Sequence, residues 1–233
     1  GRRVPNAARR ATVLTVPSEH VKSSVATSFG VDPGRIVVVR HGIESTLGAR
    51  PTPEAELRSR FGIRTSRVLV YPAITHPHKN HEFLLELLAG PWGDPEISVV
   101  FAGGAGLADE RVTRVIADKG LGDRVVRTGR VRPADRDGLI AMAEAVVFPS
   151  QFEGFGAPIV EAMAIGTPVI ASNATAIPEV AGGAGVVLPL SIEEWSGALD
   201  MVRRRREELI VSGKSRAAHF TARGSAEDLL VAY

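Results

Sequence analysis

Two glutamates, eight residues apart around a glycine-containing loop, are the side chains whose types and spacing most clearly allow ligand chemistry. Glu153 and Glu161 bracket Gly154 and Gly156 in the segment 151–163. Such glycines let backbone N–H groups approach a ligand closely, and the start of a helix attracts anions. A carboxylate accepts hydrogen bonds from the vicinal hydroxyls of a sugar or a ribose. A phosphate between two polyhydroxylated rings would satisfy all three features, and that molecule is a nucleotide sugar.

Each glutamate also has a simpler explanation when it is taken alone. Glu161 fits a surface position on a helix, and Glu153 fits a charge that the helix dipole favours. Pro158 suits a first helical turn, because its missing N–H breaks no hydrogen bond there. The two glutamates together, on either side of a glycine loop that follows an apolar run, favour a ligand site.

A second candidate segment, 71–80, contains a lysine at the start of a predicted helix. Lys79 is unfavourable to the helix dipole at that position unless an anion is present, although a solvated loop lysine is the alternative. His76, His78 and His81 lie close together in the sequence. Pro77 and their mixed spacing give no regular set of ligands, so we expect no metal site.

Two further loops carry residues with more than one explanation. Gly103 and Gly104 belong to a glycine cluster that either lies against a phosphate or ring, or forms a tight strand-to-helix turn. Asp109 replaces the third glycine of a dinucleotide fingerprint, which disfavours a nicotinamide-dependent oxidoreductase. Thr175 either binds a ligand or caps its own loop. Glu179 is expected to cap a short helix.

The elements that must position these loops follow from the hydrophobic pattern. Short runs that are apolar throughout, without alternation, are typical of strands buried on both faces of a parallel sheet. They are Val68–Tyr71, Ser98–Ala102, Arg124–Arg127, Ala145–Phe148, Pro168–Ala171 and Val186–Leu188. The segments between them have helical periodicity, and Ser191 with Glu194 forms a capping box before one such helix. This alternation predicts a doubly wound parallel, Rossmann-like α/β sheet that binds ligands at the carboxyl ends of its strands.

The first 45 residues form a smaller group of elements. We expect strands at Thr12–Val16 and Ile36–Val39 with a helix at Glu19–Phe29 between them. Two strands and one helix cannot bury their own faces, so this piece is expected to pack on the main domain or on another part of a longer protein.

Composition narrows the classes of function. The 233 residues contain 28 Lys and Arg against 26 Asp and Glu, and this net charge of +2 makes no case for a nucleic-acid partner. With Cys 0, disulfides and thiolate metal sites are excluded. No apolar run is long enough to cross a bilayer. We expect a cytoplasmic protein, with peripheral association at the inner face of the membrane left open. Because the chain begins with Gly1, we expect it to belong to a longer protein.

These segments resemble the C-terminal domain of the family-4 glycosyltransferases, which are retaining enzymes of the GT-B fold. Segment 153–163 matches the family's Glu–seven residues–Glu motif, and Gly166–Ile170 matches the strand that follows it. Weaker likenesses to the same family lie at Val16–Glu19, Val39–Glu44, Ala176–Val180 and Ala226–Tyr233.

The resemblance implies a division of the chain. Residues 1–45 would be the closing segment of an otherwise absent N-terminal acceptor domain, and residues 46–66 a linker and first helix. Residues 67–212 would form the nucleotide-sugar-binding Rossmann-like domain, and residues 213–233 a C-terminal helical tail. The absent domain would be supplied in cis or by a partner chain, and the chain alone is expected to transfer sugar poorly.

The resemblance also implies a role for each candidate residue. Lys79 and Glu153 would be the catalytic pair, with Lys79 on the diphosphate and Glu153 on the transferred sugar, and Glu161 would bind the nucleotide ribose. The other donor-binding positions would act through or near their backbone: Gly154, Phe155, Gly156 and Ala157 at the sugar, Gly103 and Gly104 at a phosphate or ring, and Arg130 and Val131 near the base. No metal and no cofactor other than the nucleoside diphosphate sugar is expected.

The implied reaction transfers a hexose, from GDP-mannose or a UDP-sugar, to a hydroxyl of a carbohydrate or lipid-linked acceptor by front-face displacement. The family usually has an arginine five residues before the phosphate lysine, and Ile74 stands there in this sequence. Either another cation, His76 or His78, replaces it or binding is weaker. A non-catalytic donor-binding subunit and a GT-B-type nucleotide-sugar epimerase are the alternatives.

Overall fold

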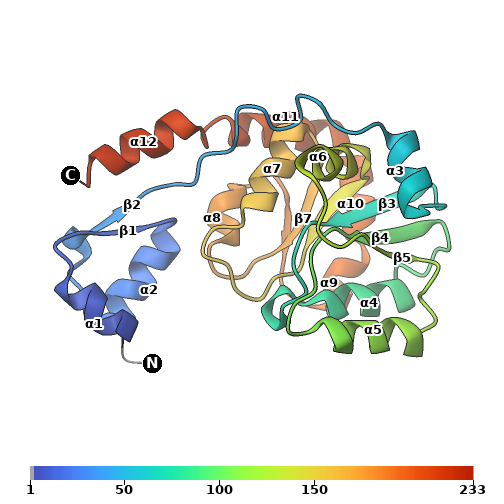
Figure 1. The fold of residues 1–233 in the computed structure, drawn as a ribbon, viewed down its shortest axis with the longest axis horizontal. Helices are drawn as coiled ribbons and strands as arrows, with labels where there is room; N and C mark the ends of the chain where they lie inside the picture. The colour runs from blue at the N-terminus through green and yellow to red at the C-terminus, as the bar shows by residue number, and fades with distance from the viewer. Residues whose placement is uncertain (1–2, 233) are drawn as a thin grey trace.

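The computed structural model describes residues 3–232 and contains two groups of elements joined by a connecting segment (Figure 1). The larger group is built on a six-stranded sheet with the strand order β5-β4-β3-β6-β7-β8, and every pair in it is parallel. Its strands are β3 (Arg67–Tyr71), β4 (Ile97–Phe101), β5 (Val125–Arg127), β6 (Ala145–Phe148), β7 (Val169–Ser172) and β8 (Val186–Leu188). The doubly wound sheet predicted from the apolar runs is therefore confirmed.

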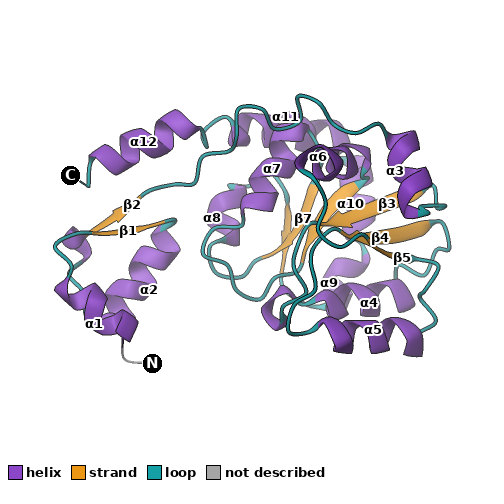
Figure 2. Cartoon of the chain, viewed as in Figure 1, coloured by secondary structure: helices purple, strands orange, loops and turns teal. Residues whose placement is uncertain are grey.

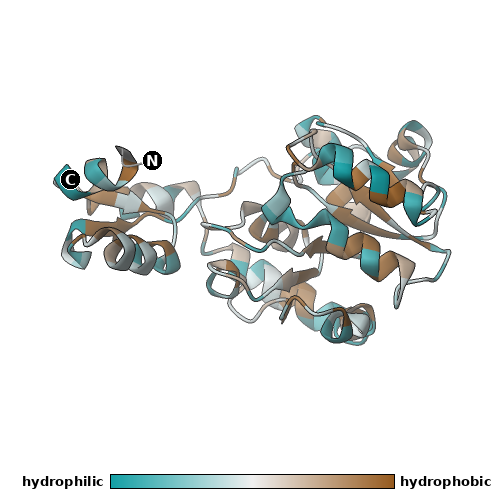
Figure 3. Ribbon diagram, turned by 90° about the horizontal axis from the view of Figure 1, so that it is seen from below, coloured by the Kyte–Doolittle hydropathy of each residue, from teal (hydrophilic) through white to brown (hydrophobic). Residues whose placement is uncertain are grey.

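The strand order places a topological switch point between β3 and β6. The chain winds outward from β3 to β4 and β5, and then returns to the other side of β3 for β6, β7 and β8. At the centre of the sheet, Leu69 is paired with Ala145 and Val70 with Val146, and all four side chains are buried. Figure 3 shows the strands as a hydrophobic centre between the helices. Ligands of such sheets bind outside the carboxyl ends of the strands at this point.

Helices cover both faces of the sheet (Figure 2). Contacts link α3, α6, α7 and α11 in one series, and α4, α5 and α9 in another. The bounds of the helices in this group are α3 (Glu54–Phe61), α4 (His81–Ala89), α5 (Asp109–Asp118), α6 (Pro133–Met142), α7 (Ala157–Ile165), α8 (Ile177–Ala181), α9 (Ile192–Ser196), α10 (Ala198–Arg204) and α11 (Arg206–Ala217). Among residues 3–232, no helix is both long and apolar enough to cross a membrane.

Half of the capping box predicted at Ser191 is present: the Ser191 hydroxyl accepts a hydrogen bond from the backbone N–H of Glu194, whereas the Ser191 N–H donates to the Pro189 carbonyl rather than to the Glu194 carboxylate. The helix behind it is shorter than the periodicity suggests. It breaks at Gly197 into α9 and α10, and both parts bury apolar residues, Trp195 in α9 and Leu199 in α10. α11 in turn runs through position 213. The functional division of the chain stays a prediction.

The smaller group consists of α1 (Arg3–Arg10), β1 (Leu14–Val16), α2 (Glu19–Phe29) and β2 (Ile36–Val38). β1 and β2 form a parallel pair, so α2 is the crossover of a β-α-β unit. This group has a separate hydrophobic cluster of Ala8, Val16, Val31 and Ile36. α1 was not predicted from the sequence.

Three contacts tie the smaller group to the larger one. The Ser18 hydroxyl donates to the Gly154 carbonyl at 2.8 Å. The Glu179 carboxylate accepts the backbone N–H groups of Glu19 and His20 at 2.9 and 3.0 Å. Glu179 was expected to cap a short helix, and it lies in the first turn of α8, but its carboxylate caps α2 instead. In addition α12 (Ala222–Leu230) contacts β2.

Candidate functional site

The loops that follow β3 and β6 meet at the switch point of the sheet. The Tyr71 hydroxyl donates to the carbonyl of Lys79 at 2.7 Å, and the Gln151 N–H donates to the carbonyl of His78 at 2.8 Å. Asn80 has a φ of 56°, in the left-handed region that asparagine tolerates. These bonds hold the loop after β3 against the loop after β6, so that the two segments singled out in the sequence form one surface.

Lys79 and Glu153 are paired across this junction. The Lys79 ammonium donates to a Glu153 carboxylate oxygen at 2.5 Å, and their side chains are only 17% and 12% exposed. The ammonium also lies 5.5 Å from the centre of the Phe148 ring. The two residues that the resemblance assigned to catalysis therefore contact each other, and in this state each neutralises the charge of the other.

Thr175 holds the loop that carries Glu153. Its hydroxyl accepts the Glu153 N–H at 2.9 Å and donates to the Glu153 carbonyl at 3.0 Å. The backbone of Thr175 has a φ of 52°, which is uncommon for a β-branched residue. Of the two uses expected for Thr175, the structure has loop capping, and this fixes the position of the Glu153 backbone.

The start of α7 follows the sequence expectation closely. Gly156 is the N-cap with a φ of 97°, a conformation that favours glycine, and Pro158 lies in the first turn. Phe155 is buried and packs against the rings of His41 and Phe220, with centroids 5.1 and 5.4 Å away. Its side chain belongs to the core, so only its backbone is available to a ligand.

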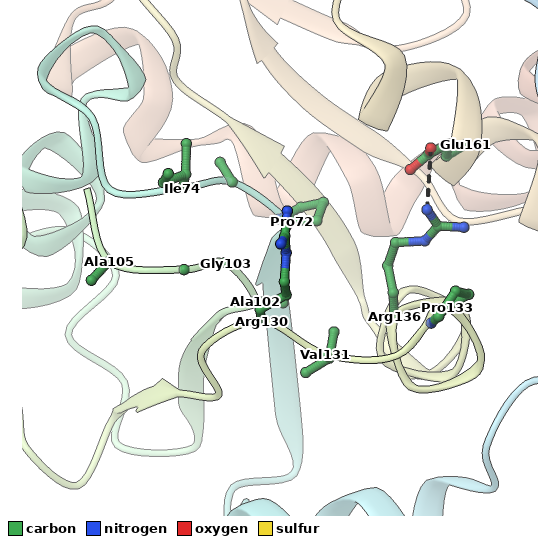
Figure 4. A pocket seen from close by; sticks show the side chains of 12 residues that line it. Pro72, Ile74, Ala102, Gly103, Ala105, Arg130, Val131, Pro133, Arg136 and Glu161 are labelled. Atoms are coloured by element: carbon green, nitrogen blue, oxygen red, sulfur yellow. Dashed lines mark ion pairs between the residues drawn. The ribbon is translucent and has the colours of Figure 1, made fainter.

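A cavity of about 550 Å³ lies beside this junction, at the carboxyl ends of β3, β4 and β5. Five of the predicted donor-binding residues line it, namely Gly103, Gly104, Arg130, Val131 and Glu161 (Figure 4). Pro72, Ile74 and Arg136 are also part of the lining. Within the described chain, the Lys79–Glu153 pair and residues 154–157 lie outside the lining. The predicted site residues thus form two groups: those that line the cavity, and those that form the ion pair and the start of α7.

The glycines of the cluster after β4 have two different roles. A Cβ on Gly103 would lie 1.9 Å from the Ala73 carbonyl oxygen, and one on Gly106 would lie 2.5 Å from that of Thr75. A Cβ on Gly104 would meet no atom within 4 Å. Gly103 and Gly106 are therefore needed for packing between the two loops, whereas Gly104 keeps its face of the cavity open.

This difference gives a matched pair of substitutions. Gly103→Ala is expected to lower the free energy of unfolding by about 2–3 kcal/mol, because the new methyl group overlaps a backbone carbonyl. Gly104→Ala is expected to leave stability within about 0.5 kcal/mol and to weaken the binding of any ligand that fills the cavity roughly tenfold, since the methyl group enters the cavity. Chemical denaturation and calorimetric titration measure the two effects. Equal loss of stability in both variants would contradict the assignment of Gly104 to the cavity.

Glu161 is the carboxylate of the cavity, and its environment is electrostatically mixed. Its side chain is 20% exposed, and burial raises the pKa of the carboxyl above its usual value. Arg136, 3.5 Å away, opposes that shift, while the carboxylates of Asp137 and Glu44 add to it. Sequence reasoning did not single out Arg136. The absence of an arginine at position 74 could have prompted a search for a replacement cation in the loops and helices that follow the neighbouring strands.

The cations that line the cavity are Arg130 and Arg136. Ile74 is 38% exposed there. His76 accepts a hydrogen bond at Nδ1 from the backbone N–H of Leu107 at 3.3 Å, and its ring stacks on that of His78. Neither of these two histidines is among the described residues that line the cavity, so the expectation that one of them replaces the arginine beside the donor gains no support.

The neighbouring His81 is directed into the core. It packs against Tyr71 and Phe101 at centroid distances of 4.7 and 4.8 Å. The three histidines of this segment therefore do not converge. Within residues 3–232, no group of three or more His, Cys, Asp or Glu side chains is placed to hold a metal ion.

The fold and this site define a class of protein. A doubly wound parallel sheet with a cavity among the loops at its carboxyl end, and with a lysine and two glutamates near its switch point, is a Rossmann-like domain of the GT-B type. The chain belongs to the family described as glycosyl transferases group 1, whose model matches residues 54–208.

Named relatives and solved structures agree with this assignment. The MMP alpha-(1->4)-mannosyltransferase of Mycolicibacterium hassiacum is 30% identical over 87% of this chain and 48% of its own length. The O-antigen chain mannosyltransferase B of Escherichia coli is 31% identical over 75% of this chain and 46% of its own. The chain thus spans about half the length of these relatives. A crystal structure of Anabaena HepE in complex with UDP and glucose superposes with a TM-score of 0.86 at 21% identity, covering 99% of this chain and 65% of that one.

Proposed function

We propose that this chain supplies the donor site of a retaining family-4 glycosyltransferase and corresponds to its C-terminal domain, with the preceding segment closing the N-terminal domain. The observation that carries the proposal is that the Lys79–Glu153 pair and the cavity lined by Glu161 both lie at the carboxyl end of the sheet, in the loops and helices that follow its strands. A cation, two carboxylates and an open glycine backbone suit a diphosphate between two hydroxyl-bearing rings. The donor is the only small molecule that this proposal requires besides the acceptor.

In the proposed complex the nucleotide occupies the cavity, with its ribose hydroxyls on Glu161 and its base near the backbone of Arg130 and Val131. The diphosphate passes Gly104 toward Lys79. The sugar lies at the start of α7, where Glu153 and the backbone N–H groups of 154–156 bind its hydroxyls. Donor binding then separates Lys79 from Glu153, because the phosphate and the sugar hydroxyls replace each partner of the ion pair.

The chemistry follows from these positions. The acceptor oxygen attacks the anomeric carbon on the face from which the diphosphate departs, and the bond from that carbon to the phosphate oxygen breaks. The proton of the acceptor hydroxyl passes to the departing phosphate. Lys79 stabilises the negative charge that develops on the diphosphate, and Glu153 holds the sugar in the reactive orientation.

The names of the relatives do not single out one donor, since two at 30% and 31% identity are mannosyltransferases and others at 28–31% are D-inositol 3-phosphate glycosyltransferases. A mannosyl donor is one candidate. A UDP-sugar is the other donor consistent with the proposal. The acceptor, a carbohydrate or a lipid-linked molecule, would be bound by a domain supplied in cis or by a partner chain, because these relatives are about twice as long as the matched region. Cytoplasmic location stays a prediction from the sequence.

The proposal is tested by calorimetric titration of the chain with UDP, GDP, dTDP and NAD. Saturable binding of one nucleoside diphosphate is expected. Glu161→Ala should weaken that binding by about 1–3 kcal/mol, because hydrogen bonds to a charged carboxylate are lost. Binding of NAD alone, or unchanged affinity for the diphosphate in Glu161→Ala, would refute the assignment of the donor site.

A further inference from the structure

Arg136 reaches the donor cavity from α6 and faces Glu161 (Figure 4). One terminal nitrogen of its guanidinium lies 3.5 Å from a Glu161 carboxylate oxygen. The Nε and the other terminal nitrogen donate to a single oxygen of Asp137 at 3.0 and 2.9 Å. The planar guanidinium is therefore held on one side by a carboxylate and presents its remaining N–H groups to the other.

Asp137 is itself held by a residue that lies outside the sheet and helices of the larger group. Its side chain is 7% exposed, and its second oxygen accepts the backbone N–H of Gly48 at 2.9 Å. Gly48 has a φ of 71° and belongs to the segment that connects β2 to α3. A continuous series of contacts therefore runs from this connecting segment through Asp137 and Arg136 to Glu161.

We propose that Arg136 is a positioning residue that orients the Glu161 carboxylate toward the nucleotide, and that Gly48 and Asp137 hold Arg136 for this task. The inference rests on the proposed function, since it deepens the role of the same donor site. It also makes donor binding depend on the conformation of the connecting segment, because that segment supplies the N–H that fixes Asp137.

The charges around Glu161 explain why a positioning cation is needed. Burial favours the protonated carboxyl, and the carboxylates of Asp137 on α6 and Glu44 in the connecting segment act in the same direction. Arg136 acts against all three, and Arg130 also lines the cavity. A protonated carboxyl loses part of its capacity to accept ribose hydroxyls. Arg136 therefore keeps the pKa of Glu161 lower than burial and the two carboxylates alone would make it.

The test is the pH profile of nucleotide binding. Wild type, Arg136→Gln and Arg136→Lys are titrated with UDP and with GDP between pH 5.5 and 8.5. Arg136→Gln is expected to weaken binding roughly threefold at pH 8 and more than roughly tenfold at pH 5.5, because the Glu161 pKa rises further without its cation. Arg136→Lys keeps the positive charge and should restore the wild-type profile in large part.

Arg132→Gln is the matched control. Arg132 precedes the same helix, is 69% exposed and pairs with Asp135. The same change of charge there should leave the profile unchanged. Superimposable profiles for wild type and Arg136→Gln would overturn the inference. Tighter binding by Arg136→Gln would also overturn it, because Arg136 would then compete with the nucleotide for Glu161.

A second measurement separates this inference from the proposed function. The Glu161 carboxyl carbon is titrated by NMR in the ligand-free chain, in wild type, Arg136→Gln and Asp137→Asn. Arg136→Gln should move the Glu161 pKa upward, because it removes the opposing cation, whereas Asp137→Asn removes a carboxylate that itself raises this pKa and should move it downward. An unchanged Glu161 pKa in Arg136→Gln would refute the positioning role, even if nucleotides bind. Absence of nucleotide binding by the wild type, together with a moved pKa, would instead count against the proposed function alone.

Discussion

Replacing Lys79 with alanine is expected to weaken the binding of a nucleoside diphosphate by roughly 100-fold while the parent nucleoside binds as before. Two effects combine. The charge-assisted bond to the phosphate is lost. The Glu153 carboxylate, which is 12% exposed and pairs with Lys79, then keeps an uncompensated negative charge beside the phosphate site. Calorimetric titration with UDP and uridine, and with GDP and guanosine, measures the difference.

Two further variants make this result specific. The double variant Lys79→Ala, Glu153→Ala should recover part of the lost affinity, because the repelling carboxylate is absent. Lys119→Ala removes a lysine that pairs with Glu86 at 2.9 Å on the helix surface, and it should bind the diphosphate normally. Equal losses for nucleoside and diphosphate in Lys79→Ala would argue against a phosphate contact.

Acid is expected to destabilise this protein through His81. The side chain is 2% exposed, and neither ring nitrogen has a hydrogen-bond partner among the described residues. Burial lowers the pKa of His81 to about 4, a shift that the nearby Ala73 carbonyl only partly opposes. The unfolded chain binds this proton below about pH 6.5, the folded chain only below about pH 4. The free energy of unfolding should therefore fall by about 3 kcal/mol as the pH drops from 6.5 to 4.

Urea denaturation at several pH values measures the slope of the free energy of unfolding against pH. His81→Phe isolates the contribution of the imidazole to that slope. Phenylalanine keeps an aromatic ring against Tyr71 and Phe101, so the variant should fold and lose the slope attributed to His81. His219→Gln changes an exposed histidine and should retain the wild-type slope. A slope that is identical in wild type and His81→Phe would show that other groups cause any acid instability.

The sheet was predictable because its signal is local. β6 and β8 agree with the predicted apolar runs residue for residue, β3 and β5 differ by one residue at one end, and β4 and β7 are displaced by one residue at both ends. A strand buried on both faces needs apolar side chains at every position, and few other elements produce that pattern. The start of α7 was predictable for a related reason, since Pro158 suits the first turn of a helix and Gly156 tolerates the left-handed conformation of the residue before it.

What the sequence left open depends on contacts between distant residues. Glu179 caps α2, which precedes it by about 160 residues, and no local rule connects the two. Gly103 and Gly104 are neighbours, and only the path of the loop after β3 decides which of them packs and which faces the cavity. Arg136 has an ordinary place in a polar helix until the fold brings it to Glu161.

The path of the chain between the two groups of elements has a mechanical consequence. The chain crosses once near residue 42 and again near residue 221, where Ile43 forms a parallel β-bridge with Thr221. A Cβ on Gly42 would lie 2.6 Å from the Ala222 nitrogen, so the two crossings are in van der Waals contact. The bridge therefore holds the two crossings side by side and limits how far each segment can twist independently of the other. Relative movement of the two groups should therefore be a hinge rotation about one axis rather than a rotation about several axes.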